Sequence, residues 1–560
     1  MNLLKQFTPF WLTGICIAYF LVGFFSNFYT SLYSFILLCL VFQVISGSLS
    51  HILLVDAQSN IKFNWRERWT TWLFFGLTAA MAIKAVSIVW QFPDLFDRRI
   101  LFMDGSRLGI FLFLLMPSFL GSIFIARRLD RSNYRDRLQK APVWIFIQRN
   151  LAGIVLSIFF LFIYLLFANT INFPGYDTVD RYFDTDISEW LSRLAYVTPE
   201  QFMARAVHPA VLLFLRPLVE FISFFLHGDK FQAVFLLNAL TGASCVFLAW
   251  LITRHITENT TFSLIMAFLL GMGTPHLLLG SMIETYIYSA FALLLFVYLM
   301  QSNKTDLKYT IPAGVLVFGI TVTNLIQTCI LYVFKDPRVK VIVKYVAAVL
   351  AITLILNVLQ AQIYQYVKVL YNPADLLFEQ KYGLNFLDKD WARVGRFLLM
   401  VRAILLYAVV APKPFILTTE IGSATPTFSV FKVTIGEFHV AGYTGLADLT
   451  AKLWMVIFFA ACILFVWKLF KSPGKMRLPL ALVVCMGFNL LLHTFWGDDP
   501  MLYSPDWAYA LVLFTAYSLQ DWANNKWVQV AFILFLGLMT ITNLDLIHQI
   551  MQVSQPFFGK

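Results

Sequence analysis

Long apolar runs, each about the length of a transmembrane helix, recur along this chain of 560 residues. A helix needs about 20 apolar residues to cross the hydrocarbon core of a bilayer, and on that basis we expect about 13 crossings. The predicted spans are residues 8–25, 31–47, 71–91, 108–126, 150–170, 231–253, 262–280, 285–301, 341–361, 453–470, 479–495, 506–520 and 528–547. This series predicts an all-α, polytopic transmembrane helical bundle.

The composition excludes a soluble protein. Hydrophobic residues make up 59% of the chain and charged residues 13%, with a mean hydropathy of +0.74. A soluble fold of this size could not hide so much apolar surface. A transmembrane β-barrel is excluded too, because its strands are short segments of alternating polarity.

Two further apolar stretches are interrupted by charged or helix-breaking residues. They are residues 209–227, which contain Arg216 and Glu220, and residues 311–332, which contain Pro312, Gly314, Gly319 and Asn324. Interruptions of this kind favour short, broken or re-entrant helices that line a protein cavity.

The basic loop at residues 127–149 sets the expected orientation. The net charge of the chain is +11, and this short loop carries its densest cluster of arginines. Such loops stay in the cytoplasm and touch anionic headgroups, which explains the charge without a nucleic-acid partner. Loops 171–207, 362–451 and 496–505 then fall on the external side.

The order of spans and loops predicts four parts. Residues 1–149 form N-terminal accessory helices, and residues 150–361 form a membrane core that includes the acidic external loop 171–207. Residues 362–451 form an external or juxtamembrane segment, because they are too long for an ordinary connection. Residues 452–560 add the C-terminal transmembrane helices.

The acidic loop contains Asp184 and Asp186 in the sequence FDTDISEW. An ionised carboxylate at the membrane surface can accept the proton of a sugar hydroxyl as a general base. A pair of carboxylates can also hold a divalent cation. The alternative is a solvated loop without a task. We predict Asp184 and Asp186 as catalytic residues, and as the ligands if a metal binds.

Arg205 and His208 follow in the sequence ARAVHP. The planar guanidinium of arginine matches the oxygens of a phosphate group, and His208 could add a donor. The alternative is an interfacial anchor with a capping histidine. We predict both residues to bind the phosphate of a substrate.

Glu284 stands at the expected external end of an apolar helix, with Tyr288 one turn later on the same face. A carboxylate at that depth is costly unless it is paired or hydrated, which favours a cavity that binds a sugar hydroxyl or an arginine. The alternative is an acid that is stabilised at a helix start by the helix dipole.

The late external loop WGDDPMLYS contains Asp498, Asp499 and Tyr503. Aromatic rings beside carboxylates suit sugar recognition, because rings stack on the apolar faces of sugars and acids bind their hydroxyls. An interfacial aromatic belt explains the rings equally well but not the paired acids. We predict these three residues to bind substrate.

Other common chemistries lack their motifs. The chain contains no GxxxxGK[ST] phosphate loop, no HExxH and no GxSxG sequence, and its eight histidines are scattered.

The order of these features resembles the polytopic GT-C glycosyltransferases, which include protein O-mannosyltransferases and bacterial lipid A aminoarabinose transferases. The resemblance covers residues 150–510: a span, the loop with Asp184, then ARAVHP, MIETY, GITVTN at 319–324 and WGDDPMLYS. It differs from the simplest family plan, in which the acidic loop follows the first helix, so the role of residues 1–149 is open.

The resemblance implies a GT-C-like fold and a polyprenyl-phosphate sugar as donor. It also implies that the aspartate of the acidic loop acts as base or orients the acceptor, with Asp184 as the best match and Asp186 as the second. The segment from Arg205 to His208 would face the phosphate and Glu284 would line the cavity. No family role transfers to Asp498 or Asp499.

We therefore expect an inverting membrane glycosyltransferase that acts on the external face of a bacterial inner membrane. Its expected partners are the lipid-linked donor, an external glycan, lipid or protein acceptor, and membrane lipids. No cofactor is required, although a divalent metal is compatible with the site. The alternatives are a transporter or flippase of a lipid-linked or anionic solute, and a non-catalytic scaffold.

Overall fold

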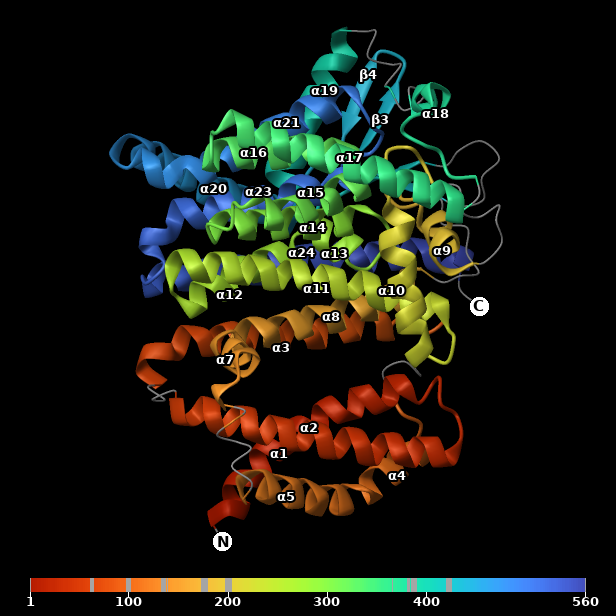
Figure 1. Cartoon of the computed structure of the whole chain (residues 1–560), viewed down its shortest axis with the longest axis vertical. Coiled ribbons are helices and arrows are strands. Elements are labelled where there is room, and N and C mark those ends of the chain that lie inside the picture. Colours follow the sequence, from red (N-terminus) through yellow and green to blue (C-terminus); the bar gives the residue numbers. More distant parts are fainter. Residues whose placement is uncertain are drawn as a thin grey trace. The chain divides into compact units, whose positions relative to one another are not determined.

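The computed structural model describes residues 2–60, 65–96, 102–131, 137, 139–172, 180–196, 204–364, 366–379, 383, 390–418 and 426–558 (Figure 1). The expected acidic loop is thus described in part, and its residues 173–179 and 197–203 lie outside the described ranges. Contacts between residues divide the chain into two compact units.

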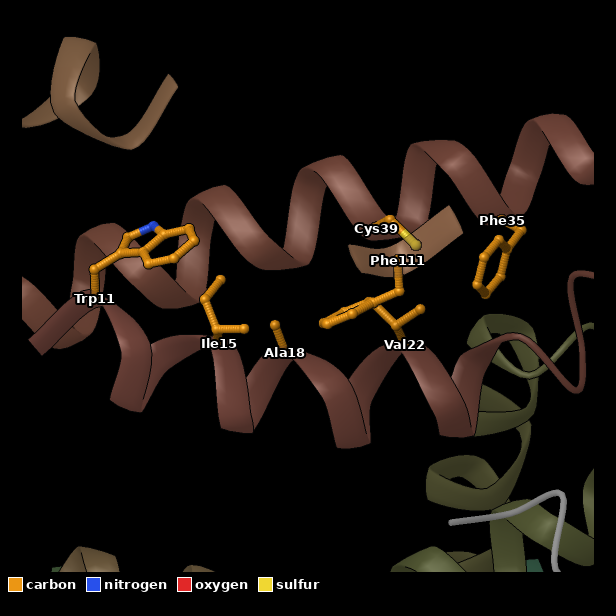
Figure 2. Close-up of a cluster of buried hydrophobic side chains, with 7 residues drawn as sticks. All are labelled: Trp11, Ile15, Ala18, Val22, Phe35, Cys39 and Phe111. Carbon is orange, nitrogen blue, oxygen red and sulfur yellow. The ribbon is translucent and has the colours of Figure 1, made fainter. Parts of the chain in front are cut away.

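The smaller unit comprises Met1–Trp69, Phe96–Ile154 and Ser223–Asp229. Its helices are α1 (Asn2–Phe25), α2 (Leu32–Asn60), α4 (Gly105–Phe113), α5 (Leu115–Arg131) and α7 (Pro142–Arg149). Its core lies between α1, α2 and α4, where Trp11, Ile15, Ala18, Val22, Phe35, Cys39 and Phe111 pack together (Figure 2). Burial of this apolar surface holds the three helices together.

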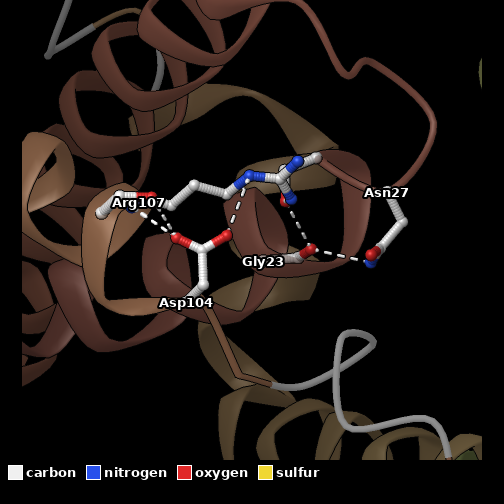
Figure 3. A network of polar contacts seen from close by, with 6 residues as sticks. Gly23, Asn27, Asp104 and Arg107 are labelled. Carbon is white, nitrogen blue, oxygen red and sulfur yellow. Dashed lines mark hydrogen bonds and ion pairs between the residues drawn. The ribbon is translucent and has the colours of Figure 1, made fainter.

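Asp104 begins α4 as its N-cap, because its carboxylate accepts a hydrogen bond from the backbone N–H of Arg107 at 2.8 Å. The Arg107 guanidinium returns to the same carboxylate at 3.6 Å. At the end of α1, Asn27 donates to the carbonyl of Gly23 at 3.0 Å (Figure 3). These polar contacts fix the ends of two helices whose middles are held by apolar packing.

The larger unit comprises Thr70–Leu95, Val155–Ile222 and Lys230–Lys560. Thr70–Leu95, which the sequence analysis grouped with the N-terminal helices, therefore clusters with the larger unit. The helices that belong wholly or mainly to it are α3 (Trp65–Trp90), α8 (Leu151–Ile171), α9 (Ile187–Ala195), α10 (Val211–Phe225), α11 (Lys230–Thr257), α12 (Thr260–Met272), α13 (Thr274–Leu279), α14 (Tyr286–Gln301), α15 (Leu307–Ile320), α16 (Leu325–Lys335), α17 (Val339–Ile363), α18 (Pro373–Phe378), α19 (Asp390–Arg402), α20 (Gly445–Lys471), α21 (Arg477–Phe495), α22 (Pro500–Tyr503), α23 (Pro505–Leu519) and α24 (Lys526–Phe558). Short helical turns are η3 (Val322–Asn324), η6 (Ala403–Tyr407), η7 (Pro473–Met476) and η8 (Gln520–Trp522).

Helix α23 is the centre of the larger unit. Every residue of α23 is buried, and the helix packs against α11, α12, α14, α20 and α21. A helix that is apolar on all sides is typical of the middle of a bundle. Around it, α8, α11, α14, α15 and α17 lie with nearly parallel axes in Figure 1.

Two short antiparallel hairpins follow α19, and the sequence analysis did not predict them. Strand β1 (Ile416–Thr418) pairs with β2 (Thr427–Ser429) in the register Leu417 to Phe428. Strand β3 (Phe431–Thr434) pairs with β4 (Glu437–Val440) in the register Val433 to Phe438.

By length and composition, the described residues contain eight helices that could cross a membrane, or up to nine if one bent pair is a single span. The chain is thus a multi-pass helical membrane protein. Four shorter apolar helices lie among them, including Thr260–Met272 and Tyr286–Gln301. The count of about 13 crossings stays a prediction.

Two predicted spans are interrupted in the structure. The span at 262–280 breaks at Gly273, where ψ is 142° and α12 ends. Pro275, in the first turn of α13, explains the break, because it has no N–H to bond back into α12 and its ring would clash with the carbonyl four residues earlier. The span at 108–126 bends by 40° between α4 and α5. Pro117 explains this bend, since it lacks the N–H that would continue the helix. The stretch 311–332 is broken as expected, at Thr321.

The larger unit has two chemically different ends. Arg396 and Arg402 of α19 bond to the end of α21 and to Ala441 just before α20, so these termini lie at one end with the hairpins. At the other end, Lys468 near the end of α20 pairs with Asp521 after α23. All the predicted site residues belong to the first end.

Candidate functional site

The loop with Asp184 has a left-handed backbone that is fixed by strand β2. Asp180, Phe183 and Asp184 have φ angles of 56°, 56° and 63°. The Phe183 N–H donates to the Phe428 carbonyl at 2.8 Å, and the Phe428 N–H donates to the Arg181 carbonyl at 2.8 Å. Such a backbone is uncommon outside glycine, and it persists where the surrounding structure imposes it. The loop therefore presents Asp184 in one defined position.

Asp184 is partly buried and surrounded by other acids. Burial raises the pKa of the Asp184 carboxyl well above its usual range, and the negative charges of Asp498, Asp180, Asp499 and Asp186 raise it further, in that order. Asp184 and Asp498 come from two loops that the sequence predicts to be external. The structure thus brings both loops to one volume.

Asp186 and Glu284 form a second, deeper acidic pair. Burial raises the pKa of Asp186 to about 6, with a contribution from Glu189. Glu284 lies between α13 and α14 and accepts a bond from the Thr285 hydroxyl at 3.2 Å. Burial and then the charge of Asp186 raise the pKa of Glu284 to about 8. These shifts are those of buried carboxyls that lie close to each other.

Two buried oxygens beside this pair have no hydrogen-bond partner among the described residues: Oε2 of Glu284 and the hydroxyl of Tyr288. Nearby, Arg193 pairs with Glu189 and lies 4.8 Å from the centre of the Trp190 ring. Buried polar atoms are costly when unpaired, so these two oxygens are suited to bind a polar group.

Arg205 borders the same acidic volume and is held by an ion pair. Its Nε lies 3.1 Å from Oε2 of Glu379, and its Nη2 also contacts this oxygen. The Arg205 side chain keeps 21% of its surface exposed, whereas that of Glu379 keeps 6%. Burial raises the pKa values of Asp186, Asp498 and Tyr503, and the positive charge of Arg205 partly offsets that rise, which places Arg205 near residues that also surround Asp184.

His208 is held inside the protein and does not present a proton to the site. Its Nδ1 lies 2.6 Å from the carbonyl oxygen of Ile320, so this nitrogen must be the donor. Burial, followed by the charge of Arg205, lowers the pKa of His208 to about 3, which keeps the ring neutral. Its Nε2 therefore carries no proton, and we do not place His208 among the phosphate donors.

Asp499 joins the late external loop to the hairpins. Its carboxylate accepts bonds from the Ser429 hydroxyl at 2.7 Å, the Val430 N–H at 2.9 Å and the Met501 N–H at 2.9 Å. Three internal donors leave it little capacity for substrate, whereas the neighbouring side chain of Asp498 is exposed. The geometry thus separates the two acids: Asp499 positions the loop and Asp498 faces outward.

Arg396 is a residue of the site that the sequence analysis did not select. This fully buried guanidinium donates to the carbonyls of His493 at 3.1 Å, Asp498 at 2.7 Å and Gly497 at 2.8 Å. Burial lowers its pKa to about 10, so it stays charged. Its signal in the sequence was a basic residue that directly precedes an apolar stretch of a helix.

Tyr503 completes the site from α22. Its ring stacks on His493 with 4.4 Å between centroids and meets the edge of Tyr286 at 5.0 Å. Gly497 passes so close to this ring that an added Cβ would lie 2.5 Å from it. The aromatic group is fixed in place beside Asp498.

Pairwise electrostatic interactions therefore connect the predicted residues Asp184, Asp186, Arg205, Glu284, Asp498, Asp499 and Tyr503, with Glu284 joined to the others through Asp186. Tyr288 interacts electrostatically with Glu284, and His208 interacts with Arg205. Within the described ranges, no three His, Cys, Asp or Glu side chains are arranged to hold a metal ion. The roles of these residues stay predictions.

Comparisons of the chain with protein-family models, with curated proteins and with solved structures found no match.

Proposed function

We propose that this protein is a membrane glycosyltransferase that moves a sugar from a polyprenyl-phosphate donor to an acceptor hydroxyl at the acidic end of the larger unit. The observation that carries the proposal is the convergence of Asp184, Asp498, Tyr503 and Arg205 on one volume. A base, a sugar-binding acid and ring, and a phosphate-binding cation are the groups that such a reaction requires.

In the proposed reaction, the acceptor oxygen attacks the anomeric carbon while its proton passes to the carboxylate of Asp184. The bond between that carbon and the phosphate oxygen breaks, and the lipid phosphate leaves with the electron pair. Direct displacement inverts the anomeric centre. Arg205 stabilises the negative charge that develops on the leaving phosphate, and it exchanges Glu379 for the phosphate when the donor binds.

The raised pKa of Asp184 has a direct consequence for this reaction. Burial and four acidic neighbours disfavour the charged form, so at a given pH more of this carboxyl holds a proton than in an ordinary aspartate. It acts as a base only after losing that proton, and it is then a stronger base than an ordinary carboxylate. Transfer should therefore become faster as the pH rises.

The test is incubation of the purified protein with a panel of polyprenyl-phosphate sugars and candidate acceptors, followed by mass spectrometry. We expect one donor to be consumed with release of polyprenyl phosphate. If the whole panel stays intact with every acceptor, the proposal loses its support.

A transporter of a lipid-linked or anionic solute is the second candidate. The helix breaks at Gly273 and Thr321, together with the buried Glu284, favour it, because transporters bind solutes at broken helices. Movement of the same donors across protein-containing vesicles without chemical change would support this candidate over transfer.

A further inference from the structure

A basic pocket lies at the end of the larger unit opposite the acidic site. Its volume is about 420 Å³, and it lies where α11 and α20 end and η7 begins. Its lining includes Thr257, Trp467, Lys468, Lys471, Lys475 and Asp521. The proposed function does not use this pocket.

The lysines of the pocket differ in how their charges are compensated. Lys468 is buried, pairs with Asp521 at 2.9 Å and donates to the Ser518 carbonyl at 2.9 Å. Lys471 and Lys475 are exposed, and the described part of the chain offers neither ammonium group a hydrogen bond or an ion pair. The pocket therefore holds two uncompensated positive charges.

The surroundings of the pocket resemble the boundary of a bilayer. Gly445–Lys471 and Pro473–Phe495 are both candidate membrane spans, and the pocket lies at their junction. Trp467 exposes 66% of its surface beside the pocket, as aromatic residues do at headgroup depth. With the acidic site external, this end faces the cytoplasm, where anionic lipids are enriched.

We propose that the pocket binds the headgroup of an anionic phospholipid, with its phosphate between Lys471 and Lys475 and its acyl chains along α20 beside Trp467. The simpler explanation is that the lysines stabilise the negative end of the α20 dipole. That explanation does not account for Lys468, which donates to the Ser518 carbonyl at the end of α23 and pairs with Asp521, nor for a cavity that extends to Lys475 beyond α20. The inference does not depend on glycosyl transfer.

The test is native mass spectrometry of the full-length protein with phosphatidylglycerol or phosphatidylcholine of identical acyl chains. We expect the anionic lipid to bind about tenfold more tightly, and the double variant Lys471→Gln/Lys475→Gln to lose about tenfold of that affinity. The matched control is Lys340→Gln/Lys344→Gln at the start of α17, which removes the same charge from exposed lysines elsewhere and should bind like the unmodified protein.

Two results would overturn the proposal. One is unchanged phosphatidylglycerol affinity in the pocket variant. The other is displacement of the lipid by glycerol phosphate at equal concentration, which would assign the pocket to a soluble anion. If the double variant does not fold, Lys475→Gln on the exposed turn should still lower the affinity about threefold.

Discussion

At the scale of single residues, Asp184 combines an unusual backbone with an unusual charge environment. Its φ of 63° places it in the left-handed region, which aspartate and asparagine tolerate better than most residues. Its raised pKa comes from burial and from acids on two external loops. The proton on Asp184 is therefore sensitive to each neighbouring charge.

This sensitivity predicts the effect of Asp498→Asn. After burial, the charge of Asp498 is the largest cause of the raised pKa of Asp184, so its removal should lower that pKa and move the acid limb of the pH–rate profile to lower pH. The measurement is kcat/KM against pH for the unmodified protein and the variant. If the acid limb of kcat/KM lies at the same pH in both proteins, the protonation of Asp184 does not determine the pH–rate profile.

Asp186 predicts a change in stability with pH. Its folded pKa is about 6, above the value of about 3.9 for an unfolded aspartate. The folded state holds the proton more tightly, so the stabilisation is complete below the unfolded value and is lost as the pH rises through 6. The melting temperature of Asp186→Asn minus that of the unmodified protein should therefore increase as the pH rises from about 4 to above 6.

The control for that measurement is Asp306→Asn, at an exposed carboxylate outside the site. Its difference in melting temperature from the unmodified protein should stay constant across the same pH range. A constant difference for Asp186→Asn as well would contradict the assigned environment.

At the scale of elements, the turn between α21 and α22 depends on two unlike features. The guanidinium of Arg396 binds the carbonyls of His493, Gly497 and Asp498, and Gly497 allows the chain to pass the Tyr503 ring with a φ of 83°. The turn positions both Asp498 and Tyr503, so its geometry determines that of the site.

Gly497→Ala should disrupt this turn. Alanine is disfavoured at positive φ, and its Cβ would overlap the Tyr503 ring, so we expect a loss of about 2 kcal/mol or more in unfolding free energy and a loss of transfer. Chemical denaturation in detergent measures the first effect. Gly442→Ala, where an added Cβ meets no atom within 4 Å, should be close to neutral; equal behaviour of the two variants would contradict this account.

The sequence predicted elements well where the signal is local. The apolar runs anticipated α8 and α11 within a few residues, and Gly and Asn marked the break after α15. The breaks at Gly273 and near Pro117 were missed, although each proline was visible, because an apolar run of full length was read as continuous. The hairpins after α19 have strands too short to show a pattern.

The site was predictable only in part, because only some of its residues give a local signal in the sequence. Charges in external loops identified Asp184, Arg205 and Asp498, because charged groups are costly near a bilayer. The partners Glu379 and Arg396 make contacts between residues far apart in the chain, and no local pattern reveals these pairings. The hydrogen bonds of Asp499 to Ser429 and Val430 also join distant parts of the chain, so the sequence does not reveal them.

At the scale of the whole molecule, the larger unit has an acidic end and a basic end. Acids gather around Asp184 at one end, and Lys468, Lys471 and Lys475 lie at the other. Positive residues mark the cytoplasmic side of membrane proteins, which supports an external acidic site.

Labelling with a membrane-impermeant maleimide tests this orientation. In a Cys16→Ser background, which removes the exposed native thiol, Ile435→Cys in the β3–β4 turn should react in intact cells. Lys475→Cys should react only after permeabilisation. Reaction of both from the same side would contradict the assigned topology.

The account as a whole depends on Asp184 as the base, and donor turnover by Asp184→Asn measures this most directly. Asparagine keeps the left-handed backbone and the shape of the side chain, so a loss of activity reports the lost carboxylate. Asp180→Asn is the matched control, with the same loss of charge in the same loop and a similar φ of 56°. Because Asp180 also raises the pKa of Asp184, turnover is compared at a pH above the acid limb of the profile. We predict that Asp184→Asn slows release of polyprenyl phosphate by about a hundredfold or more while Asp180→Asn stays within a few-fold of the unmodified protein; equal turnover by Asp184→Asn and the unmodified protein would contradict the mechanism.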